Sequence, residues 1–304
     1  MTETLHLVDA SIYVFRAYFS LPPSFTSKNG EVVNAVHGYT GFLLDVLAHQ
    51  PRYLACAFDE SLNTCFRNNL YPLYKANREA PDANLTYQFE QCQRVTGLLG
   101  LRHLAMPDFE ADDIIGSWAA SWRRLAPVTS RVVILSRDKD LGQLLEKDDE
   151  LWDFAADQRA GPAGILAKFG VSVAQLADYL ALAGDAVDNI PGAPGIGAKT
   201  AASLLQQFDS LEALLARPEA VADSGLRGAK KLAATLLAER EQLRLYRQIT
   251  AIKCDIPLTD TLPDLVPAAA DQAALADFAD EMRLSSRLRG RIEALAAPSN
   301  EVNP

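Results

Sequence analysis

The chain of 304 residues has few cysteines, no long apolar run and no excess of basic charge. Its four cysteines (Cys56, Cys65, Cys92 and Cys254) form no CxxC pair and lie far apart, which argues against a zinc site or a disulfide framework. The longest aliphatic run, 132–135, is far too short to cross a bilayer. The first residues have neither a basic segment nor a long apolar stretch. We therefore expect no secretory signal, no membrane partner and a location in the reducing cytoplasm.

The net charge of −10 argues at first sight against a nucleic-acid partner, because domains that bind nucleic acids usually carry a basic surface. Nine of the 39 acidic residues, however, fall in compact clusters. Without those nine, 29 basic residues face 30 acidic ones. Divalent metal ions bound to the clusters would offset much of the excess, so the net charge alone does not decide the partner. A hydrophobic share of 49% with 22% charged residues is typical of a globular protein with a sizeable core.

Short apolar runs, each followed by acidic residues, predict the central sheet. They cover 5–8, 53–58, 101–106 and 132–135, with 151–154 as a fifth candidate. Most lack the alternation of a sheet with one wet face, so they are typical of buried parallel strands. Helical spacing of apolar residues follows at 34–49, 85–99 and 112–125. This order predicts an α/β fold with a parallel-type central sheet flanked by helices.

The strand signal disappears after about residue 170. Helices are predicted at 173–183 and 198–208, joined by a Gly/Pro-rich stretch, and further along at 211–215 and 228–249. An Ala-rich stretch at 268–297 predicts one or two loosely packed terminal helices, followed by a frayed tail over 298–304. We therefore divide the chain into an α/β core (1–170), a helical subdomain (171–256) and a C-terminal extension with its tail (257–304).

Acidic residues gather at the carboxyl ends of the predicted strands, the edge where ligands bind in such sheets. They are Asp9, Asp59, Glu110, Asp112, Asp113, Asp138 and Asp140. Any one of them alone is explained by a helix cap or a solvated charge. Seven carboxylates on one edge would repel one another strongly unless cations lie between them. Oxygen ligands without His or Cys favour Mg²⁺ or Mn²⁺ over zinc.

The spacing within the acidic groups indicates how they meet. Glu110 and Asp113 share a helix face if the helix begins by Glu110, but we favour Glu110 in the loop and a helix starting at Asp112. Asp138 and Asp140 would share one side of an extended segment. A further pair, Asp185 and Asp188, would reach the edge if the helical part packs beside it. Two metal ions about 3.5–4 Å apart on such carboxylates suit in-line displacement at phosphorus.

The Gly/Pro-rich segment 192–200 is the second chemical signal. Its residues Gly192, Gly195, Ile196, Gly197, Lys199 and Thr200 predict a tight hairpin that leads into a helix N-terminus. Free backbone N–H groups and the helix dipole there suit a phosphate oxygen. A dinucleotide fingerprint is excluded because the loop joins two helices rather than a strand and a helix. A helix-hairpin-helix that grips a DNA backbone fits better than a plain helical turn.

The third signal is the stretch 60–84, in which basic and aromatic residues alternate. Lys75 and Arg78 are three residues apart and would project from one face of a helix beside the acidic edge. Cations in that place could hold and neutralise a scissile phosphate, and the aromatic rings could stack on unpaired bases. The alternative is a solvated basic helix with core aromatics.

In order along the chain, the segments 7–9, 57–59, 74–78, 109–113, 138–141, 184–189 and 192–200 resemble the motifs of the bacterial 5′ nucleases. This family comprises the 5′→3′ exonuclease domain of DNA polymerase I and the related flap endonucleases. The likeness runs from about residue 5 to 255 and continues weakly to about 295. It is specific because seven motifs occur in register. No polymerase domain follows, so the chain resembles a stand-alone member.

The resemblance implies a PIN-like nuclease core with a helical arch at about 60–90 and a helix-hairpin-helix subdomain at 171–256. It assigns Asp9, Asp59, Glu110, Asp112 and Asp113 to one metal cluster. A second cluster takes Asp138, Asp140, Asp185 and Asp188. Lys75 and Arg78 match the catalytic basic pair at the base of the arch. The hairpin matches a motif that holds duplex DNA, often with a K⁺ ion. Ala10 departs from the glycine of many members, which only adjusts the strand-to-helix turn.

The leading hypothesis is thus a structure-selective 5′→3′ exonuclease and 5′ flap endonuclease that uses two or more Mg²⁺ or Mn²⁺ ions. Its partner would be DNA with a 5′ flap, a fork or a 5′ end, and we expect a monomer. One alternative is a non-catalytic module that binds DNA junctions and keeps its acids for solubility. Another is a ribonuclease with the same acidic-edge architecture, because no residue pattern here reads the sugar 2′-OH directly.

Overall fold

The computed structural model describes residues 2–60, 65–126 and 129–295. Six strands form one sheet in the order β3-β2-β1-β4-β5-β6. The first five run parallel, and β6 pairs antiparallel with β5. Their bounds are β1 Glu3–Asp9, β2 Tyr53–Asp59, β3 Arg102–Met106, β4 Ser130–Leu135, β5 Glu150–Asp153 and β6 Gln158–Ala160. The predicted α/β fold is confirmed, and the antiparallel edge strand is an addition to it.

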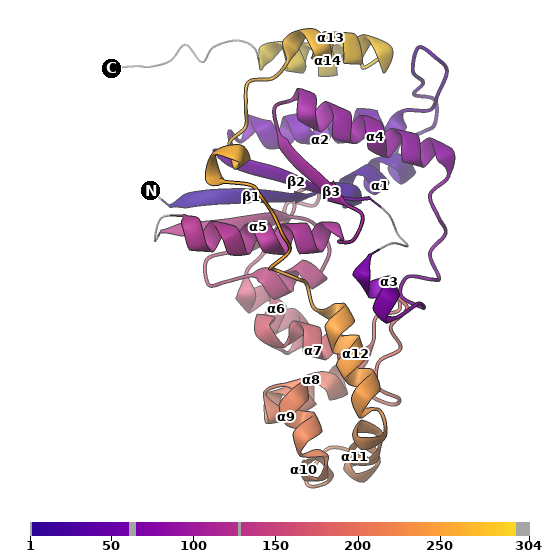
Figure 1. Cartoon of the computed structure of the whole chain (residues 1–304), viewed down its shortest axis with the longest axis vertical. Helices are drawn as coiled ribbons and strands as arrows, with labels where there is room; N and C mark the ends of the chain where they lie inside the picture. Colours follow the sequence, from indigo (N-terminus) through magenta and orange to yellow (C-terminus); the bar gives the residue numbers. More distant parts are fainter. Residues whose placement is uncertain (1, 61–64, 127–128, 296–304) are drawn as a thin grey trace.

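The continuous apolar strands are explained by burial of both faces of the sheet. Alternate residues of one strand belong to different cores, so that Leu5 and Leu7 face one side while Val8 faces the other. On the first side lies α5 (Ala111–Leu125), whose Trp118 and Trp122 are almost fully buried. On the second side lie α1 (Ala10–Ser20), α2 (Asn34–Ala48) and α4 (Ala83–Leu98). Figure 1 shows these two layers above and below the strands.

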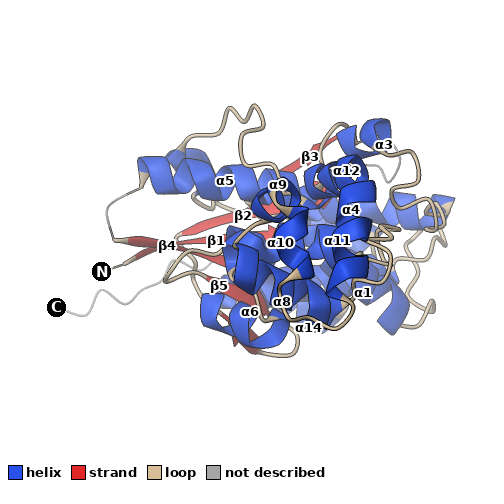
Figure 2. Cartoon of the chain, turned by 90° about the horizontal axis from the view of Figure 1, so that it is seen from below, coloured by secondary structure: helices blue, strands red, loops and turns tan. Residues whose placement is uncertain are grey.

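The segment from residue 162 to residue 250 is helical and lies below α5 in Figure 1; Figure 2 looks through it towards the sheet. The bounds are α6 Pro162–Phe169, η2 Val173–Gln175, α7 Leu176–Ala183, α8 Ala198–Phe208, α9 Leu211–Ala216, α10 Pro218–Ala222, α11 Ala229–Ala238 and α12 Arg240–Thr250. The predicted single helix at 228–249 is therefore two helices, which break at Glu239. The apolar core is continuous from α5 through α7 to α9, so this subdomain is packed against the sheet layer rather than tethered to it.

The C-terminal segment returns to the sheet. After α12 the chain runs through η3 (Leu262–Leu265) past α5 to α13 (Gln272–Glu281) and α14 (Ser286–Ala294), which cover α4 and α2 (Figure 1). Leu275, Phe278 and Met282 have no exposed surface. The prediction of loosely packed terminal helices was wrong, because these apolar residues complete the core on that side of the sheet. The predicted tail falls at the end of the chain, and residues 296–304 lie outside the described residues.

Among the residues that the structure describes, no single helix is both long and apolar enough to cross a membrane. In the same part of the chain, one pair of helices, 162–169 and 173–183, is long and apolar enough in combination, but the two helices are bent by 55° relative to each other.

Candidate active site

Four carboxylates lie at the carboxyl edge of the parallel strands, each on a different element. Asp9 ends β1 and caps α1; its Oδ1 accepts the Ile12 N–H at 3.4 Å and its Oδ2 accepts the Ser136 hydroxyl at 2.8 Å. Ser136 directly follows β4, and its Oγ accepts the N–H of Asp138 at 3.0 Å. The hydroxyl of Ser136 therefore ties the Asp9 side chain to the backbone of Asp138 across two neighbouring strands.

Asp59 ends β2 and is fixed by two neighbouring elements. Its backbone N–H donates to the Ser11 Oγ at 2.8 Å, and its Oδ1 accepts the N–H of Ala111 at 2.9 Å. Ala111 is the first residue of α5, so Asp112 follows at once on the same helix end. The strand end and the helix start thereby bring Asp59 and Asp112 to one edge with Asp9 and Asp138.

Among the residues that the structure describes, none of these four carboxylates forms an ion pair with a Lys, Arg or His side chain. Burial, followed by the charges of Asp59 and Asp138, raises the pKa of Asp9 to about 7. Burial, followed by the charges of Asp138 and Asp9, raises the pKa of Asp112 well above its ordinary value. The edge is a site of mutual repulsion that a bound cation would relieve.

The donors fit a hard divalent cation in kind, because all four are carboxylate oxygens with no His or Cys among them. Across the described ranges, no group of three or more His, Cys, Asp or Glu side chains forms a ready-made metal cage. The observation that supports a cation is therefore the unneutralised charge of this edge, not a preformed coordination shell.

A second group of acids is neutralised by the chain itself. Glu110, the N-cap of α5, forms an ion pair with Lys75 and accepts the Tyr74 hydroxyl at 2.9 Å. The same hydroxyl lies 3.2 Å from Oδ2 of Asp188, and Arg78 pairs with Oδ1 of Asp188 at 2.7 Å. Burial would lower the pKa of Lys75, but the charges of Glu110 and Asp188 raise it above its ordinary value. Lys75 therefore stays protonated beside the four unpaired carboxylates.

Lys139 joins the last two acids. Its Nζ lies 2.5 Å from Asp185 and 3.3 Å from Asp140. Burial, followed by the charge of Asp138, raises the pKa of Asp140 to about 7. Burial also acts to raise the pKa of Asp185, but the hydrogen bond and charge of Lys139 lower it below its usual range. This lysine therefore links the helical subdomain to the sheet edge.

The predicted extended segment at Asp138 to Asp140 was wrong. Asp140 begins the 3-10 helix η1 (Asp140–Leu144), and its N–H donates to Oδ1 of Asp138 at 2.9 Å. The chain turns here because the Asp138 carboxylate offers a local acceptor to the backbone two residues on. Glu110, by contrast, lies in the loop as expected, and α5 starts one residue earlier than predicted.

Asp113 does not join the other carboxylates. It has no exposed surface, and its two oxygens accept two N–H groups of Arg67 at 2.6 and 2.8 Å. They also accept the backbone N–H groups of Glu110 at 3.1 Å and Lys253 at 2.9 Å. All four acceptor sites of the carboxylate are thus in use. The structure therefore speaks against Asp113 as a metal ligand and gives it a role in holding Arg67 and the start of α5.

The prediction that Lys75 and Arg78 project from one helix was also wrong. The described part of the predicted arch contains α3 (Phe66–Leu70), consecutive turns to residue 77 and an extended stretch before α4. Lys75 has a positive φ of 54°, which no α-helix allows. Both cations nonetheless reach the acidic edge, because these turns dock on the loop 186–189 through the Lys75 N–H to the Asp188 carbonyl at 3.1 Å. Residues 61–64 of this stretch lie outside the described residues.

The Gly-rich hairpin has an anchored side and an open side. Gly192 (φ 71°) is packed so closely that a Cβ there would lie 2.4 Å from the backbone nitrogen of Gly184. Ile196 is 3% exposed and belongs to the core, so its side chain anchors the hairpin and does not face a ligand. Gly195 and Gly197 have nothing within 4 Å of a Cβ position, and Lys199 beside them is exposed on the first turn of α8. The open side presents bare backbone to solvent.

Sequence reasoning gave no role to Arg67, Ser136 or Lys139. Arg67 is buried although it is an arginine in a short helix, and nothing in its local pattern indicates that. Ser136 directly follows the predicted strand at 132–135, and Lys139 lies between Asp138 and Asp140; these positions were the only available signal.

The sequence of the chain matches two known protein-family models. A model of the "5'-3' exonuclease, N-terminal resolvase-like domain" matches residues 4–170, and one of the "5'-3' exonuclease, C-terminal SAM fold" matches residues 171–273. DNA polymerase I of Rhizobium leguminosarum is 35% identical over 310 residues, covering 99% of this chain and 30% of the relative. DNA polymerase I of Pseudomonas aeruginosa is 37% identical over 285 residues, covering 93% and 31%. The chain thus spans about a third of the length of these relatives.

Among solved structures, the T5 D15 protein co-crystallised with metal ions has a TM-score of 0.65 at 20% identity, covering 96% of this chain and 98% of the other. The catalytic core of Rad2 in complex with a DNA substrate has a TM-score of 0.64 at 14% identity, covering 97% and 92%. At these identities the likeness establishes the shared fold.

Proposed function

The chain belongs to the 5′-3′ exonuclease family, and on that basis we propose that it is a structure-selective 5′→3′ exonuclease and 5′ flap endonuclease that hydrolyses DNA phosphodiester bonds with two bound metal ions. The observation that carries the proposal is the set of four carboxylates at the sheet edge, which have no cationic partner within the described residues and lie beside Lys75 and Arg78.

Asp9, Asp59, Asp112 and Asp138 are the proposed inner metal ligands. Bound Mg²⁺ or Mn²⁺ would supply Lewis-acid stabilisation of the phosphate and activation of the attacking water. Glu110, Asp140, Asp185 and Asp188 form the outer part of the site, where Lys75, Arg78 and Lys139 now neutralise them. Their supporting role is to place these three cations, and with them the positive charge, around the inner carboxylates.

Lys75 and Arg78 are the proposed catalytic cations. Both are held at the edge by carboxylates, and Lys75 is also fixed by its backbone contact to Asp188. A fixed positive charge beside the phosphate stabilises the negative charge that grows during displacement. Arg78 is the more exposed of the two, so it meets the incoming strand first.

The hairpin is the proposed grip on duplex DNA. Gly195 and Gly197 allow a phosphate to approach the backbone, and Lys199 and Thr200 follow on the first turn of α8. A K⁺ ion bridging backbone and phosphate is compatible with this open turn, and Gly192 and Ile196 fix its base. In the proposed division, residues 1–170 carry most of the catalytic groups, residues 171–256 bind the duplex and contribute Asp185 and Asp188 to the site, and residues 257–304 complete the fold. We propose a monomer as the working form.

The test compares Asp112→Ala and Asp138→Ala with Asp277→Ala, an exposed acid on α13 far from the edge. Substrates are a labelled 5′ flap, a gapped duplex and a single strand, each with Mg²⁺ and with EDTA. We expect both edge variants to lose cleavage of the flap. In EDTA they should melt at or above the temperature of the unchanged chain, because each substitution removes a repelled charge. Asp277→Ala should cut normally.

Cleavage that continues in EDTA would contradict the proposal. Equal binding of forked DNA with and without Mg²⁺, and no cutting, would establish the non-catalytic module instead. A flap of RNA cut faster than a DNA flap of equal sequence would favour the ribonuclease.

A further inference from the structure

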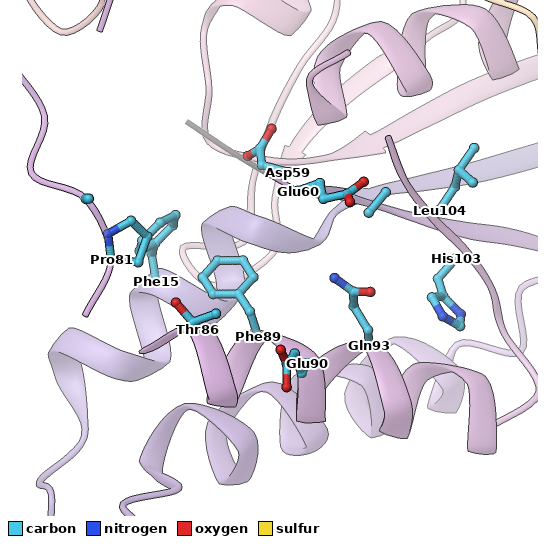
Figure 3. A pocket seen from close by; sticks show the side chains of 12 residues that line it. Phe15, Asp59, Glu60, Pro81, Thr86, Phe89, Glu90, Gln93, His103 and Leu104 are labelled. Carbon is cyan, nitrogen blue, oxygen red and sulfur yellow. The ribbon is translucent and has the colours of Figure 1, made fainter. Parts of the chain in front are cut away.

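A cavity of about 680 Å³ opens beside Asp59, between the edge strand β3 and the helix α4 (Figure 3). This volume lies within the range of about 300–1,000 Å³ that is usual for small-molecule sites. None of the contacts described so far uses it. Because Asp59 belongs both to this cavity and to the proposed metal edge, the occupant of the cavity would lie next to the scissile bond.

Aromatic rings form one end of the cavity. Phe15 from α1 and Phe89 from α4 meet edge to face, with ring centroids 5.1 Å apart and planes at 68°. Figure 3 shows the two rings side by side, with Pro81 next to Phe15. Phe19, one turn further along α1, has a ring parallel to that of Phe15, with centroids 6.5 Å apart, and its side chain is 77% exposed. The rings therefore form an apolar path from the cavity to the protein surface.

The charges around the cavity exclude a phosphate. Asp59, Glu60 and Glu90 line it, and among its described lining residues there is no lysine or arginine. Burial lowers the pKa of His103, so this ring is neutral at pH 7. Thr86 and Gln93 on α4 add uncharged hydrogen-bonding groups on the same side of the helix as Glu90. An uncharged planar group with N–H donors fits this lining, because carboxylates only accept hydrogen bonds.

We propose that this cavity is a stacking subsite for an unpaired nucleobase of the strand whose 5′ end is removed. The subsite rests on the proposed nuclease function for the identity of its ligand. A nucleobase presents a flat apolar face to Phe15 and Phe89 and polar edges to Gln93 and Glu90, and its own phosphate stays outside with Arg78. The exposed ring of Phe19 offers a second face to the following base. A paired base would be bound to its partner strand and could not enter.

The experiment measures binding in EDTA, where the proposed hydrolysis does not proceed. The DNA is a nicked duplex with a 5′ flap of none to five nucleotides that carries 2-aminopurine at one flap position at a time. Phe89→Leu keeps the apolar volume but removes the aromatic face. Leu125→Ala is the control, because Leu125 is exposed at the other end of α5, away from the acidic edge.

We expect the unchanged chain to quench 2-aminopurine at one or two flap positions, and Phe89→Leu to lose this quenching and to bind the flap about tenfold more weakly. Binding of the duplex without a flap should not change. An abasic residue at the quenched position should weaken binding by the unchanged chain by the same factor and weaken Phe89→Leu no further. The comparison of normal and abasic flaps with the unchanged chain needs no variant, so it tests the subsite even if Phe89→Leu folds poorly.

Normal flap cutting in Mg²⁺ with no quenching, or an abasic penalty that adds to that of Phe89→Leu, would overturn the subsite and leave the nuclease proposal standing. Quenching with the expected non-additive penalty, but no cutting in Mg²⁺, would support the subsite and overturn the nuclease.

Discussion

Replacing Arg67 with methionine should strongly destabilise the protein, because this one guanidinium joins three parts of the chain. Its side chain is 3% exposed and forms ion pairs with Asp113 and Glu110 at 2.6 and 3.0 Å. It also donates to the backbone carbonyls of Ile249 and Ala251 at 2.8 and 2.9 Å, at the end of α12. Methionine fills most of the volume but leaves the carboxylate of Asp113 buried without a counter-charge.

The expected loss is about 3–5 kcal/mol in the free energy of unfolding, the usual cost of removing one partner of a buried ion pair. The substitution also leaves the carbonyls of Ile249 and Ala251 without this donor, so we expect the loss of unfolding free energy to lie towards the upper end of that range. The measurement is urea unfolding at pH 7.5 of the unchanged chain, Arg67→Met and Arg67→Lys. Lysine keeps the charge but not the two-pronged geometry, so it should restore only part of the loss.

A double variant separates the charge from the packing. In Arg67→Met with Asp113→Asn, the uncompensated charge is gone, and the single amide oxygen still accepts one of the two backbone N–H groups, of Glu110 and Lys253, that the carboxylate accepts. We expect this pair to be more stable than Arg67→Met alone by about 2 kcal/mol, within the coupling range of contacting residues. A loss below about 1 kcal/mol for Arg67→Met, or purely additive effects, would refute the view of Arg67 as the clamp between α3, α5 and α12.

Three further outcomes follow from the same structure. Lys75→Ala should lower kcat by about a hundredfold or more with little change in KM if this cation stabilises the developing charge; a change in KM alone would make it a residue of substrate capture. Burial lowers the pKa of His6 from 6.5 to about 4, so the neutral ring stabilises the fold above pH 6.5. That stability, up to about 3 kcal/mol, is lost as the pH falls from 6.5 towards 4. Urea unfolding at pH 7.5 and 4.5 should show a smaller difference for His6→Gln, and an equal difference in both proteins would contradict this. Gly192→Ala should cost at least about 2 kcal/mol, because its Cβ would meet backbone, whereas Gly195→Ala should cost about 1 kcal/mol and mainly weaken duplex binding. Thermal melting and DNA titration distinguish the two, and similar melting temperatures would argue against the anchored and open sides of the hairpin.

The sheet could be predicted because strands that are buried on both faces are apolar at consecutive positions, which is visible in the sequence. Strand β1 is apolar at both Leu7 and Val8, and only a strand covered on both faces has that pattern. The acidic residues at the strand ends could be predicted for the same reason, because they directly follow apolar runs whose ends are visible in the sequence. Helix α1 was missed because it begins at Ala10, directly after the strand, with Asp9 serving as both strand end and cap.

The pairing among charges could not be predicted. The sequence shows Glu110, Asp112 and Asp113 as equivalent neighbours, yet the structure gives Glu110 to Lys75 and Asp113 to Arg67 and leaves Asp112 without a cation. Which acid is neutralised depends on cations some 35 to 46 residues away in the chain. Likewise, the turns that carry Lys75 depend on the loop 186–189 on which they dock, and no local spacing contains that information.

The return of α13 and α14 to the sheet has a consequence for biosynthesis. The apolar surfaces of α2 and α4 are translated before the side chains that cover them, Phe278 and Ile292 among them, which follow at least 180 residues later. Until α13 and α14 have been synthesised, the nascent polypeptide therefore exposes an apolar surface on which chaperones can act and aggregation can begin. Helices α13 and α14 thus complete the core over helices that are translated well before them.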